Sequence, residues 1–433
     1  MRPAGLILAG LAAAVAAMFA VAAAPRPADP RGLVLERIVV VARHGVRSPT
    51  KTVDWLSKYS ALRWPDWPVS PGELTPHGAQ DVRLMGAWLR ADYARRGLWP
   101  AAGCPGAGDT YGWADGLDQR TRASGDAELE GAFPGCGLVA RHGPEGVVDP
   151  IFDGVGSGAC PLDAEAAKAA VLARVKGDLD HPAAGYEAGK SALRQLLDPS
   201  SAVESCAPDT GGACFLSRTN DLAAKKGDLK LDGPLGLSST LTESLLLEYA
   251  QGLPTDQVGW GRAATPARLA AVMGLHNIES DLMRRTPYLA GHNAARLAEA
   301  VVQAAQGRPG LPEQGTAGSR LVLIAGHDTN LSNMAGVLGV EWMLKDQPDN
   351  TPPDGALVFE VWRDPANGAR YVRVRFIYQT LDQLREQTAL SDAHPPGEIS
   401  LRLPDCAEGP GQTCPIGKFI ERVRMAIPPE CRG

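Results

Sequence analysis

Two short segments of the sequence place histidine beside arginine or aspartate directly after an apolar run. The first is segment 43–50, RHGVRSPT, which follows the apolar residues 38–42. The second is segment 326–330, GHDTN, which follows the apolar residues 321–325. An imidazole between two guanidinium groups is electrostatically unfavourable unless an anion normally sits there. The first segment therefore predicts an anion-binding pocket with a nucleophile, His44, at its centre.

These residue types suit the hydrolysis of a phosphate monoester. A neutral imidazole can attack phosphorus and form a phosphohistidine, which water later hydrolyses. Guanidinium groups stay protonated, and their planar forks match the oxygens of phosphate. Asp328 in the second segment could supply the proton that the leaving oxygen needs. It could equally cap the helix expected to begin near Leu331, with Thr329 as a competitor for that role.

The elements that must position these segments are strands and one helix. The runs at 36–42 and 321–325 are almost uninterrupted and apolar, as in strands buried on both faces of a parallel sheet. Open α/β sheets bind ligands outside the carboxyl ends of their strands, where both segments begin. Thr75 is a good N-cap and Pro76 suits a first turn, so a long helix is expected from there. The strand at 36–42 and this helix would form a right-handed crossover.

The expected fold class is α/β, with a mixed, mainly parallel sheet flanked by helices and an inserted, mostly helical domain. The α/β catalytic domain would comprise residues 32–150 and 310–433, and the helical domain residues 151–309. Residues 356–362 and 371–377 flank a turn and predict an antiparallel hairpin. Helices are expected at 163–177, 185–197, 238–251, 264–285 and 293–306.

Composition restricts the partners. The 433 residues carry a net charge of −6, which argues against nucleic acid, because a binder of the phosphate backbone normally has a basic face. A few arginines in a cleft can still attract a small anion. We therefore expect a small-molecule phosphomonoester as substrate, and a monomeric protein.

The amino terminus resembles a targeting segment. Arg2 precedes an apolar stretch at 6–21, and residues 20–22 offer an A-x-A-like cleavage site. The alternative is an uncleaved anchor, since the stretch approaches the length that spans a bilayer. We expect residues 1–24 to be a cleaved signal peptide, which leaves a periplasmic or secreted protein without a membrane segment.

Eight cysteines in an exported chain indicate disulfide bonds. Eight cysteines allow 105 pairings in principle, and the sequence alone does not choose among them. Their spacing shows no C-x-x-C pattern, so zinc is disfavoured, and we expect no metal and no other cofactor.

The spacing Arg-His-Gly-x-Arg-x-Pro-Thr, with a distant His-Asp after a strand, resembles the histidine acid phosphatases, the larger branch of the histidine phosphatase superfamily. The likeness is greatest to bacterial periplasmic acid phosphatases and phytases. A second Arg-His-Gly at 141–143 lacks the following arginine and proline, so we interpret it as a loop. Further matching segments are 50–51, 64–69, 74–76, 119–122, 241–243, 259–262, 285–287, 347–353 and 395–398.

The resemblance implies roles for individual residues. His44 would be the nucleophile and Asp328 the proton donor. The phosphate being cleaved would be bound by Arg43, Arg47, Arg122 and His327. Outer contacts to a multiply phosphorylated substrate would come from Thr50, Lys51, Glu243 and Arg285. The implied disulfides are Cys104–Cys136, Cys160–Cys431, Cys206–Cys214 and Cys406–Cys414.

Plainer interpretations remain for three of these residues. Arg122 could simply be a solvated residue at a helix start, and Lys51 and Arg285 could be surface cations. The function implied is that of an exported acid phosphatase acting on phosphomonoesters, phytate first among them. A glucose-1-phosphatase-type enzyme is the nearer alternative, and a non-hydrolysing phosphate-ester-binding protein the more distant one. An intracellular phosphoglycerate-mutase-like transferase shares Arg-His-Gly, but the leader and the cysteines do not suit it.

Overall fold

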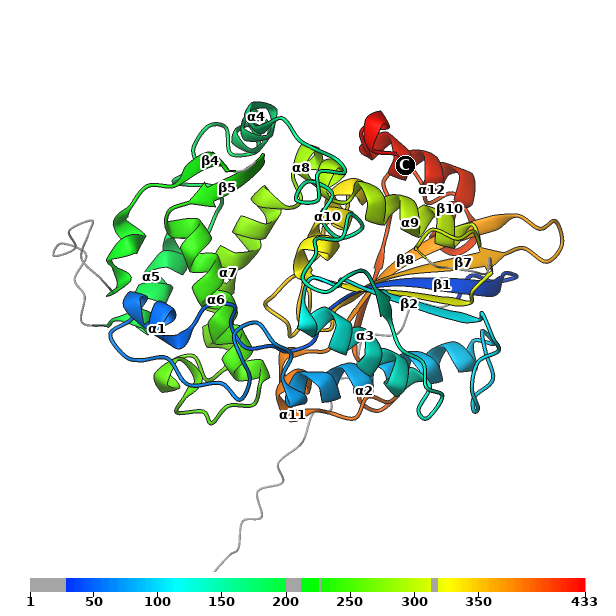
Figure 1. Cartoon of the computed structure of the whole chain (residues 1–433), viewed down its shortest axis with the longest axis horizontal. Coiled ribbons are helices and arrows are strands. Elements are labelled where there is room, and N and C mark those ends of the chain that lie inside the picture. Colours follow the sequence, from blue (N-terminus) through cyan, green and yellow to red (C-terminus); the bar gives the residue numbers. More distant parts are fainter. Residues whose placement is uncertain (1–28, 200–211, 226, 313–317, 433) are drawn as a thin grey trace, which may run out of the picture.

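The computed structural model describes residues 29–199, 212–225, 227–312 and 318–432. They form a β-sheet covered by helices on both faces, with a mostly helical part beside it (Figure 1). The expected signal peptide, residues 1–24, lies outside the described residues. No helix in the described part of the chain is long and apolar enough to cross a membrane.

The sheet is mixed, as expected, in the order β10-β8-β7-β1-β6-β2-β3, with β9 paired to β8. Its parallel half comprises β3 (Arg141–His142), β2 (Thr110–Ala114), β6 (Leu321–Gly326) and β1 (Val34–Arg43). Its antiparallel half comprises β7 (Ala356–Arg363), β8 (Arg370–Tyr378), β9 (Gly397–Leu401) and β10 (Cys414–Pro415).

The predicted hairpin is confirmed as β7 and β8, which pair along their whole length. The second Arg-His-Gly differs from the loop we expected. Its first two residues form β3, an exposed two-residue strand at the edge of the sheet. At this edge His142 is exposed, and its segment lacks a second arginine equivalent to Arg47.

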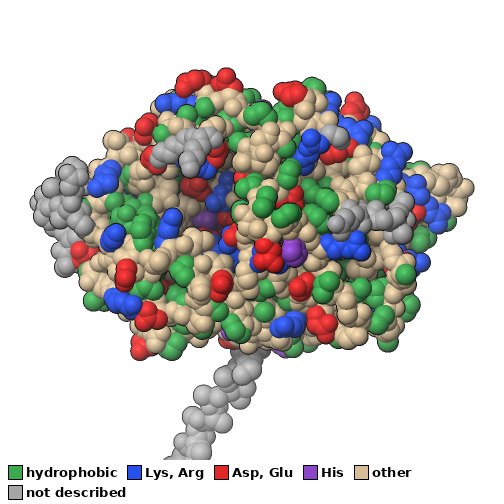
Figure 2. Space-filling view, in the orientation of Figure 1, with side chains coloured by type: hydrophobic (Ala, Val, Ile, Leu, Met, Phe, Trp, Pro, Cys, Tyr) green, Lys and Arg blue, Asp and Glu red, His purple; other side chains and the backbone are tan. Residues whose placement is uncertain are grey.

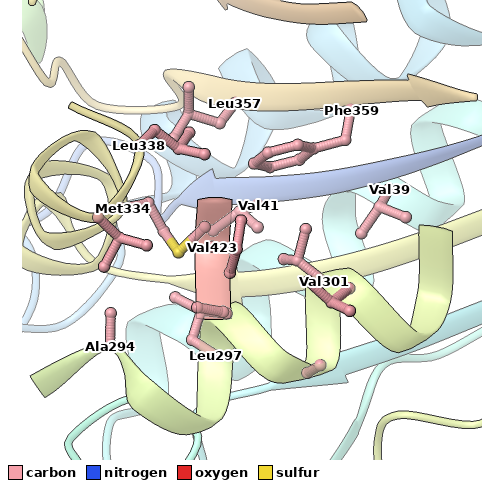
Figure 3. Packing of buried hydrophobic residues seen from close by; sticks show 14 of the residues in the cluster. Val39, Val41, Ala294, Leu297, Val301, Met334, Leu338, Leu357, Phe359 and Val423 are labelled. Atoms are coloured by element: carbon pink, nitrogen blue, oxygen red, sulfur yellow. The ribbon is translucent and has the colours of Figure 1, made fainter. Parts of the chain in front are cut away.

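Strand β1 explains the uninterrupted apolar run, because both of its faces are buried. Val39 and Val41 pack against α9 (Ala295–Ala305), α10 (Asp328–Leu338) and α12 (Ile416–Ala426) (Figure 3). Residues 38, 40 and 42 point to the opposite face, against α2 (Pro76–Arg95) and α3 (Gln119–Ala132). Side chains alternate between the faces of a strand, so a strand with helices on both sides must be apolar at every position.

The start of α2 is confirmed at its predicted cap. The Thr75 hydroxyl accepts a hydrogen bond from the Gly78 amide at 2.9 Å, and Pro76 occupies the first turn. The helix therefore begins close to the carboxyl end of β1, where segment 43–50 lies.

The helical part contains the predicted helices as α4 (Ala164–Arg174), α5 (Tyr186–Leu197), α6 (Pro234–Ala250) and α7 (Pro266–Met283). Three elements were not expected there, namely α1 (Val53–Leu56), α8 (Pro287–Asn293) and the hairpin of β4 (Asp221–Lys225) with β5 (Asp228–Asp232). Helix α9 falls within the range 151–309, yet it packs on the sheet. The domain boundaries drawn from the sequence stay a prediction.

Three of the four implied disulfides are confirmed. Their Cα–Cα distances are 5.5 Å for Cys104–Cys136, 5.3 Å for Cys160–Cys431 and 4.8 Å for Cys406–Cys414. Cys206 lies outside the described residues, so its pairing with Cys214 stays a prediction. The Cys160 bond ties the carboxyl-terminal segment after α12 to the chain before α4.

Candidate active site

Parallel pairing of β1 and β6 brings the two predicted segments together. Arg43 lies opposite Gly326 at the carboxyl ends of the strands, and the His44 amide donates to the Gly326 carbonyl at 2.9 Å. A Cβ on Gly45 would lie 2.7 Å from the Gly78 carbonyl oxygen, so only glycine lets the segment approach the start of α2 this closely. The sheet and α2 thus hold the backbone of this segment in place.

His44 is buried and oriented as a nucleophile. Its side chain is 1% exposed, and its Nδ1 lies 2.9 Å from the Gly45 carbonyl oxygen. Since a carbonyl can only accept, Nδ1 carries the proton and Nε2 keeps its lone pair. Burial, together with Arg120, Arg43 and Arg47, holds the imidazole pKa well below its usual value. The ring is therefore neutral in the free protein, as attack on phosphorus requires.

Arg43 and Arg47 are held together by one buried carboxylate. Glu243 on α6 accepts from Arg43, and both of its oxygens accept from Arg47 at 2.9 Å. Arg43 also donates to Asp349 at 2.9 Å. Burial would raise the pKa of Glu243, but Arg47 and Arg43 outweigh it and lower that pKa to about 2. Glu243 therefore fixes the two guanidinium groups, and the substrate contact that the resemblance implied for it stays a prediction.

The structure corrects the expectation for Arg122. Its half-buried guanidinium donates to the Gly116 carbonyl at 2.8 Å and to the exposed Glu145 at 2.9 Å. Arg120 lies in the cavity instead, near His44, and donates to Asp118 at 2.7 Å. Arg120 and Arg122 are two residues apart, so their side chains point about 200° apart around the helix axis. Helix α3 therefore cannot direct both of them to the site. The segment QRTR matched the family pattern, but it did not show which arginine faces inwards.

His327 and Asp328 lie where β6 passes into α10. His327 is the N-cap of α10, and its Nε2 lies 2.8 Å from an Asp115 carboxylate oxygen. Its ring centroid is 5.6 Å from that of His44, so the two predicted segments share one site. Asp328 is the first residue of the helix rather than its cap.

The carboxylate of Asp328 is paired in the free protein. It accepts a hydrogen bond from Arg284, the residue that follows α7. Burial alone would raise the Asp328 pKa, but Arg284, Arg43 and His276 together hold it well below its usual value. No signal in the sequence singled out Arg284.

A cavity of about 860 Å³ opens beside this cluster, between the sheet edge and the helical part. Figure 2 shows the corresponding hollow, with basic, acidic and histidine side chains inside it. Several of its charged residues pair with one another, as Arg120 does with Asp118 and Lys230 with Asp228. Residues that contribute to its lining include Lys51, Trp55, Tyr59, Arg120, Phe215, Lys230, Arg284, His327 and Asp328.

Of the four expected outer contacts, the structure brings Lys51 to the cavity. Its ammonium lies 5.3 Å from the centroid of the Trp55 ring and forms no ion pair with a described residue. Thr50 is exposed but lies outside the lining. Arg285 is only 9% exposed, its guanidinium lies 4.4 Å from the centroid of the Trp342 ring, and it is not part of the cavity lining. Arg284, the preceding residue, is the one that lines the cavity, and a contact of Arg285 with substrate stays a prediction.

One group of side chains could suggest a metal. Single ligand atoms of Asp115, Asp118 and His327 lie within 4.8 Å of one another. The hydrogen bond between His327 and Asp115 and the ion pair between Asp118 and Arg120 account for this proximity. We assign no metal to these residues.

Mutation of Arg120 and of Arg122, one at a time, should separate their roles. Arg120→Ala should lower kcat/KM by about 10²-fold or more, because it removes a preorganised cation beside the phosphate site. Arg122→Ala, the matched control two positions away on α3, should change kcat/KM less than threefold, since Arg122 is not part of the cavity lining and its ion pair is with the exposed Glu145. Initial rates on p-nitrophenyl phosphate measure both. Equal losses in the two variants would contradict this assignment.

Three buried carboxyl groups lie behind segment 43–50, on α2, on α3 and before β7. They are Asp81, Glu128 and Asp354, each at most 5% exposed. Burial raises the pKa of Asp81 to about 10 and that of Glu128 to about 8, and it raises the pKa of Asp354 well above its usual value. The folded protein therefore favours the neutral, protonated forms.

This cluster predicts that stability falls as the pH rises. For Glu128 the stabilising contribution is fully present below the unfolded-chain pKa of 4.5 and is lost as the pH rises through about 8. Glu128→Gln should therefore raise Tm by roughly 2 °C or more at pH 8, and change it little at pH 4. Glu130→Gln, at an exposed position on the same helix, is the control. Thermal unfolding of all three proteins at both pH values tests this; an equal Tm change at both would contradict it.

Comparison with known proteins places these observations in a family. The model for the histidine phosphatase superfamily (branch 2) matches residues 34–196 and 264–377. The chain is 36% identical over 408 residues to the phytase AppA of Escherichia coli, covering 92% of this chain and 93% of that protein. It is 29% identical to a glucose-1-phosphatase of Providencia rettgeri, covering 91% and 92% of the two chains. The structure of the Hafnia alvei phytase with myo-inositol hexakis sulphate superimposes with a TM-score of 0.85 and 38% identity, over 93% of this chain and 99% of that one.

Proposed function

Because the chain belongs to branch 2 of the histidine phosphatase superfamily, we propose that it is an exported acid phosphatase whose principal substrate is phytate. The observation that carries the phosphatase chemistry is the neutral, buried His44, with Arg43, Arg47 and Arg120 around it. The confirmed disulfides support export, because such bonds persist in oxidising compartments.

The first chemical step transfers the phosphoryl group to His44. Its Nε2 lone pair attacks phosphorus, the nitrogen–phosphorus bond forms, and the bond to the ester oxygen breaks. Arg43, Arg47 and Arg120 neutralise the phosphoryl oxygens, and His327 offers a further hydrogen-bond donor. Asp328 gives its proton to the leaving oxygen.

The second step restores the free protein. Water attacks phosphorus, the nitrogen–phosphorus bond breaks, and one proton of the water passes to Asp328 as inorganic phosphate forms. Asp328 is thus protonated when inorganic phosphate forms, and it releases this proton to solvent as it pairs again with Arg284 in the free protein. The reaction consumes one water and needs no redox partner or cofactor.

The size of the cavity and the nature of the relatives support phytate as the substrate. A volume of about 860 Å³ exceeds what a single phosphate needs and lies within the usual range of ligand sites. Lys51 offers the cavity an ammonium that is not committed to a described carboxylate. The Hafnia alvei phytase, which shares this fold, binds an inositol that carries six sulphates.

The test compares kcat/KM for phytate, glucose 1-phosphate and p-nitrophenyl phosphate. We expect phytate to be preferred to glucose 1-phosphate, and Lys51→Gln to lower kcat/KM for phytate about tenfold, the value of one charge-assisted hydrogen bond. Glucose 1-phosphate needs only the arginines around His44, so its kcat/KM should change little. Lys58→Gln, an exposed lysine outside the cavity, is the matched control.

The 29% identity to a glucose-1-phosphatase makes that activity the second candidate. A preference for glucose 1-phosphate, with Lys51→Gln affecting all substrates alike, would favour it over phytate. Phosphate release from none of the three substrates would contradict a phosphatase altogether and favour a protein that only binds phosphate esters.

A further inference from the structure

Arg284 connects the proton donor to the open cavity. It follows the last turn of α7, lines the cavity, and donates through Nη1 to the Asp328 carboxylate. Its Nη2 lies 3.6 Å from Glu279. A proton donor must carry a proton before it can act, yet this ion pair favours the carboxylate form of Asp328.

We propose that Arg284 is a positioning residue that exchanges partners during turnover. In the free protein it pairs with Asp328, and a second anionic group of the substrate draws its guanidinium away, so that Asp328 takes up the proton it later donates. This role rests on the proposed function, because it assumes that Asp328 protonates the leaving oxygen of a phosphate ester.

The surroundings of Arg284 permit such an exchange. Its side chain is 20% exposed, and the carboxylates that it contacts, Asp328 and Glu279, both line the cavity. Arg43 differs, since it is buried and donates to Asp349 and to the Thr351 carbonyl as well as to Glu243. Of these two arginines beside Asp328, Arg284 is the one that a ligand in the cavity can reach.

The charges around Asp328 determine what the exchange does to its protonation. Arg284, Arg43 and His276 hold its pKa low, against the effect of burial. When Arg284 is drawn away, burial and the phosphate bound at His44 both favour the protonated acid. The charged and titratable groups that face Asp328 are Arg284, His276 and Glu279 from α7, Arg43 from β1, Glu243 from α6, Arg120 from α3 and the adjoining His327.

This arrangement would make proton donation depend on the substrate. A small monophosphate occupies the site of Arg43, Arg47 and Arg120, and leaves the pair of Arg284 and Asp328 intact. A substrate with several phosphates can place a second one at Arg284. The preference for polyphosphorylated esters would then arise in the chemical step as well as in binding.

The test is the pH profile of kcat/KM for glycerol 2-phosphate, a monophosphate with a poor leaving group. The alkaline limb of this profile reports the essential acid of the free enzyme. Arg284→Gln should move this limb to higher pH by about 1–3 units, the usual effect of one adjacent opposite charge. Arg284→Lys keeps a positive charge and should leave the limb close to that of the wild type.

Lys51→Gln is the matched control, since it removes a charge from the same cavity without touching Asp328. It should lower kcat/KM for phytate and leave the glycerol 2-phosphate limb in place. If Arg284→Gln does not fold, Arg284→Met removes the same charge and keeps the aliphatic stem. An unchanged limb in the folded charge-removing variant, or the same shift in Lys51→Gln, would overturn the proposal.

Failure of the proposed function can be distinguished from failure of the proposal for Arg284. A wild-type protein that releases no phosphate from phytate contradicts phytate as substrate, while the glycerol 2-phosphate profile still tests Arg284. The partner exchange itself is tested by the pH profile of kcat, which reports the groups of the enzyme–substrate complex. In that profile the alkaline limb of the wild type should lie at higher pH for phytate than for glycerol 2-phosphate. Arg284→Gln should narrow that gap, and an undiminished gap would overturn the exchange.

Discussion

His44→Ala should lower kcat by roughly 10⁴-fold or more on every phosphomonoester, as the loss of an activated nucleophile does in other enzymes. The ring is neutral, buried, and presents Nε2 as its free lone pair. Rapid acid quenching is unsuitable for trapping phosphohistidine, which is acid-labile, so wild-type protein should be quenched in alkali during turnover. Labelled phosphate should then be found on His44.

The second Arg-His-Gly offers the control. His142 occupies the same tripeptide, but it lies exposed on the edge strand β3. His142→Ala should retain nearly full activity and the same amount of trapped phosphate. Near-normal turnover in His44→Ala would contradict the phosphohistidine mechanism.

Asp328→Asn should lower kcat by an amount that depends on the leaving group of the substrate. Glycerol 2-phosphate releases a poor alkoxide, and loss of a general acid should lower its kcat by about 10²–10⁴-fold. p-Nitrophenyl phosphate releases a stable phenolate that hardly needs a proton, so its kcat should fall far less. The measurement is kcat for both substrates in the wild type and the variant at the same acidic pH.

An equal loss on the two substrates would assign Asp328 a positioning role instead. The amide of asparagine cannot pair with Arg284 as the carboxylate does, so binding should be checked through KM. A change in KM alone, with the ratio of the two kcat values unchanged, would contradict proton donation.

Several features could be predicted from the sequence because they depend on local order. The apolar run of β1 requires burial on both faces, and the polar segment after it must begin where the strand ends. The cap at Thr75 places the start of α2 in the same way. The even number of cysteines indicated disulfides, but only the resemblance to a family supplied the pairing that the structure confirms for three of them.

Other features could not be predicted, because residues close together in the sequence can point in different directions. A motif match leaves open whether Arg120 or Arg122 faces the phosphate site, and the packing of α3 decides it. The same holds at the end of α7, where Arg284 enters the cavity and Arg285 lies over the Trp342 ring. The hairpin β4–β5 escaped prediction because its alanine- and charge-rich segments lack a clear strand pattern.

The sequence by itself determined the nucleophile, its flanking arginines and the two strands that deliver the site, since these lie in continuous segments with strong local patterns. Only the tertiary structure decided which charged side chains of the site pair with one another. Glu243 bridges Arg43 and Arg47, and Arg284 pairs with Asp328, across large separations in the chain. Such pairs depend on how the helical part packs against the sheet edge, and the strength of each depends on burial, which no local pattern encodes.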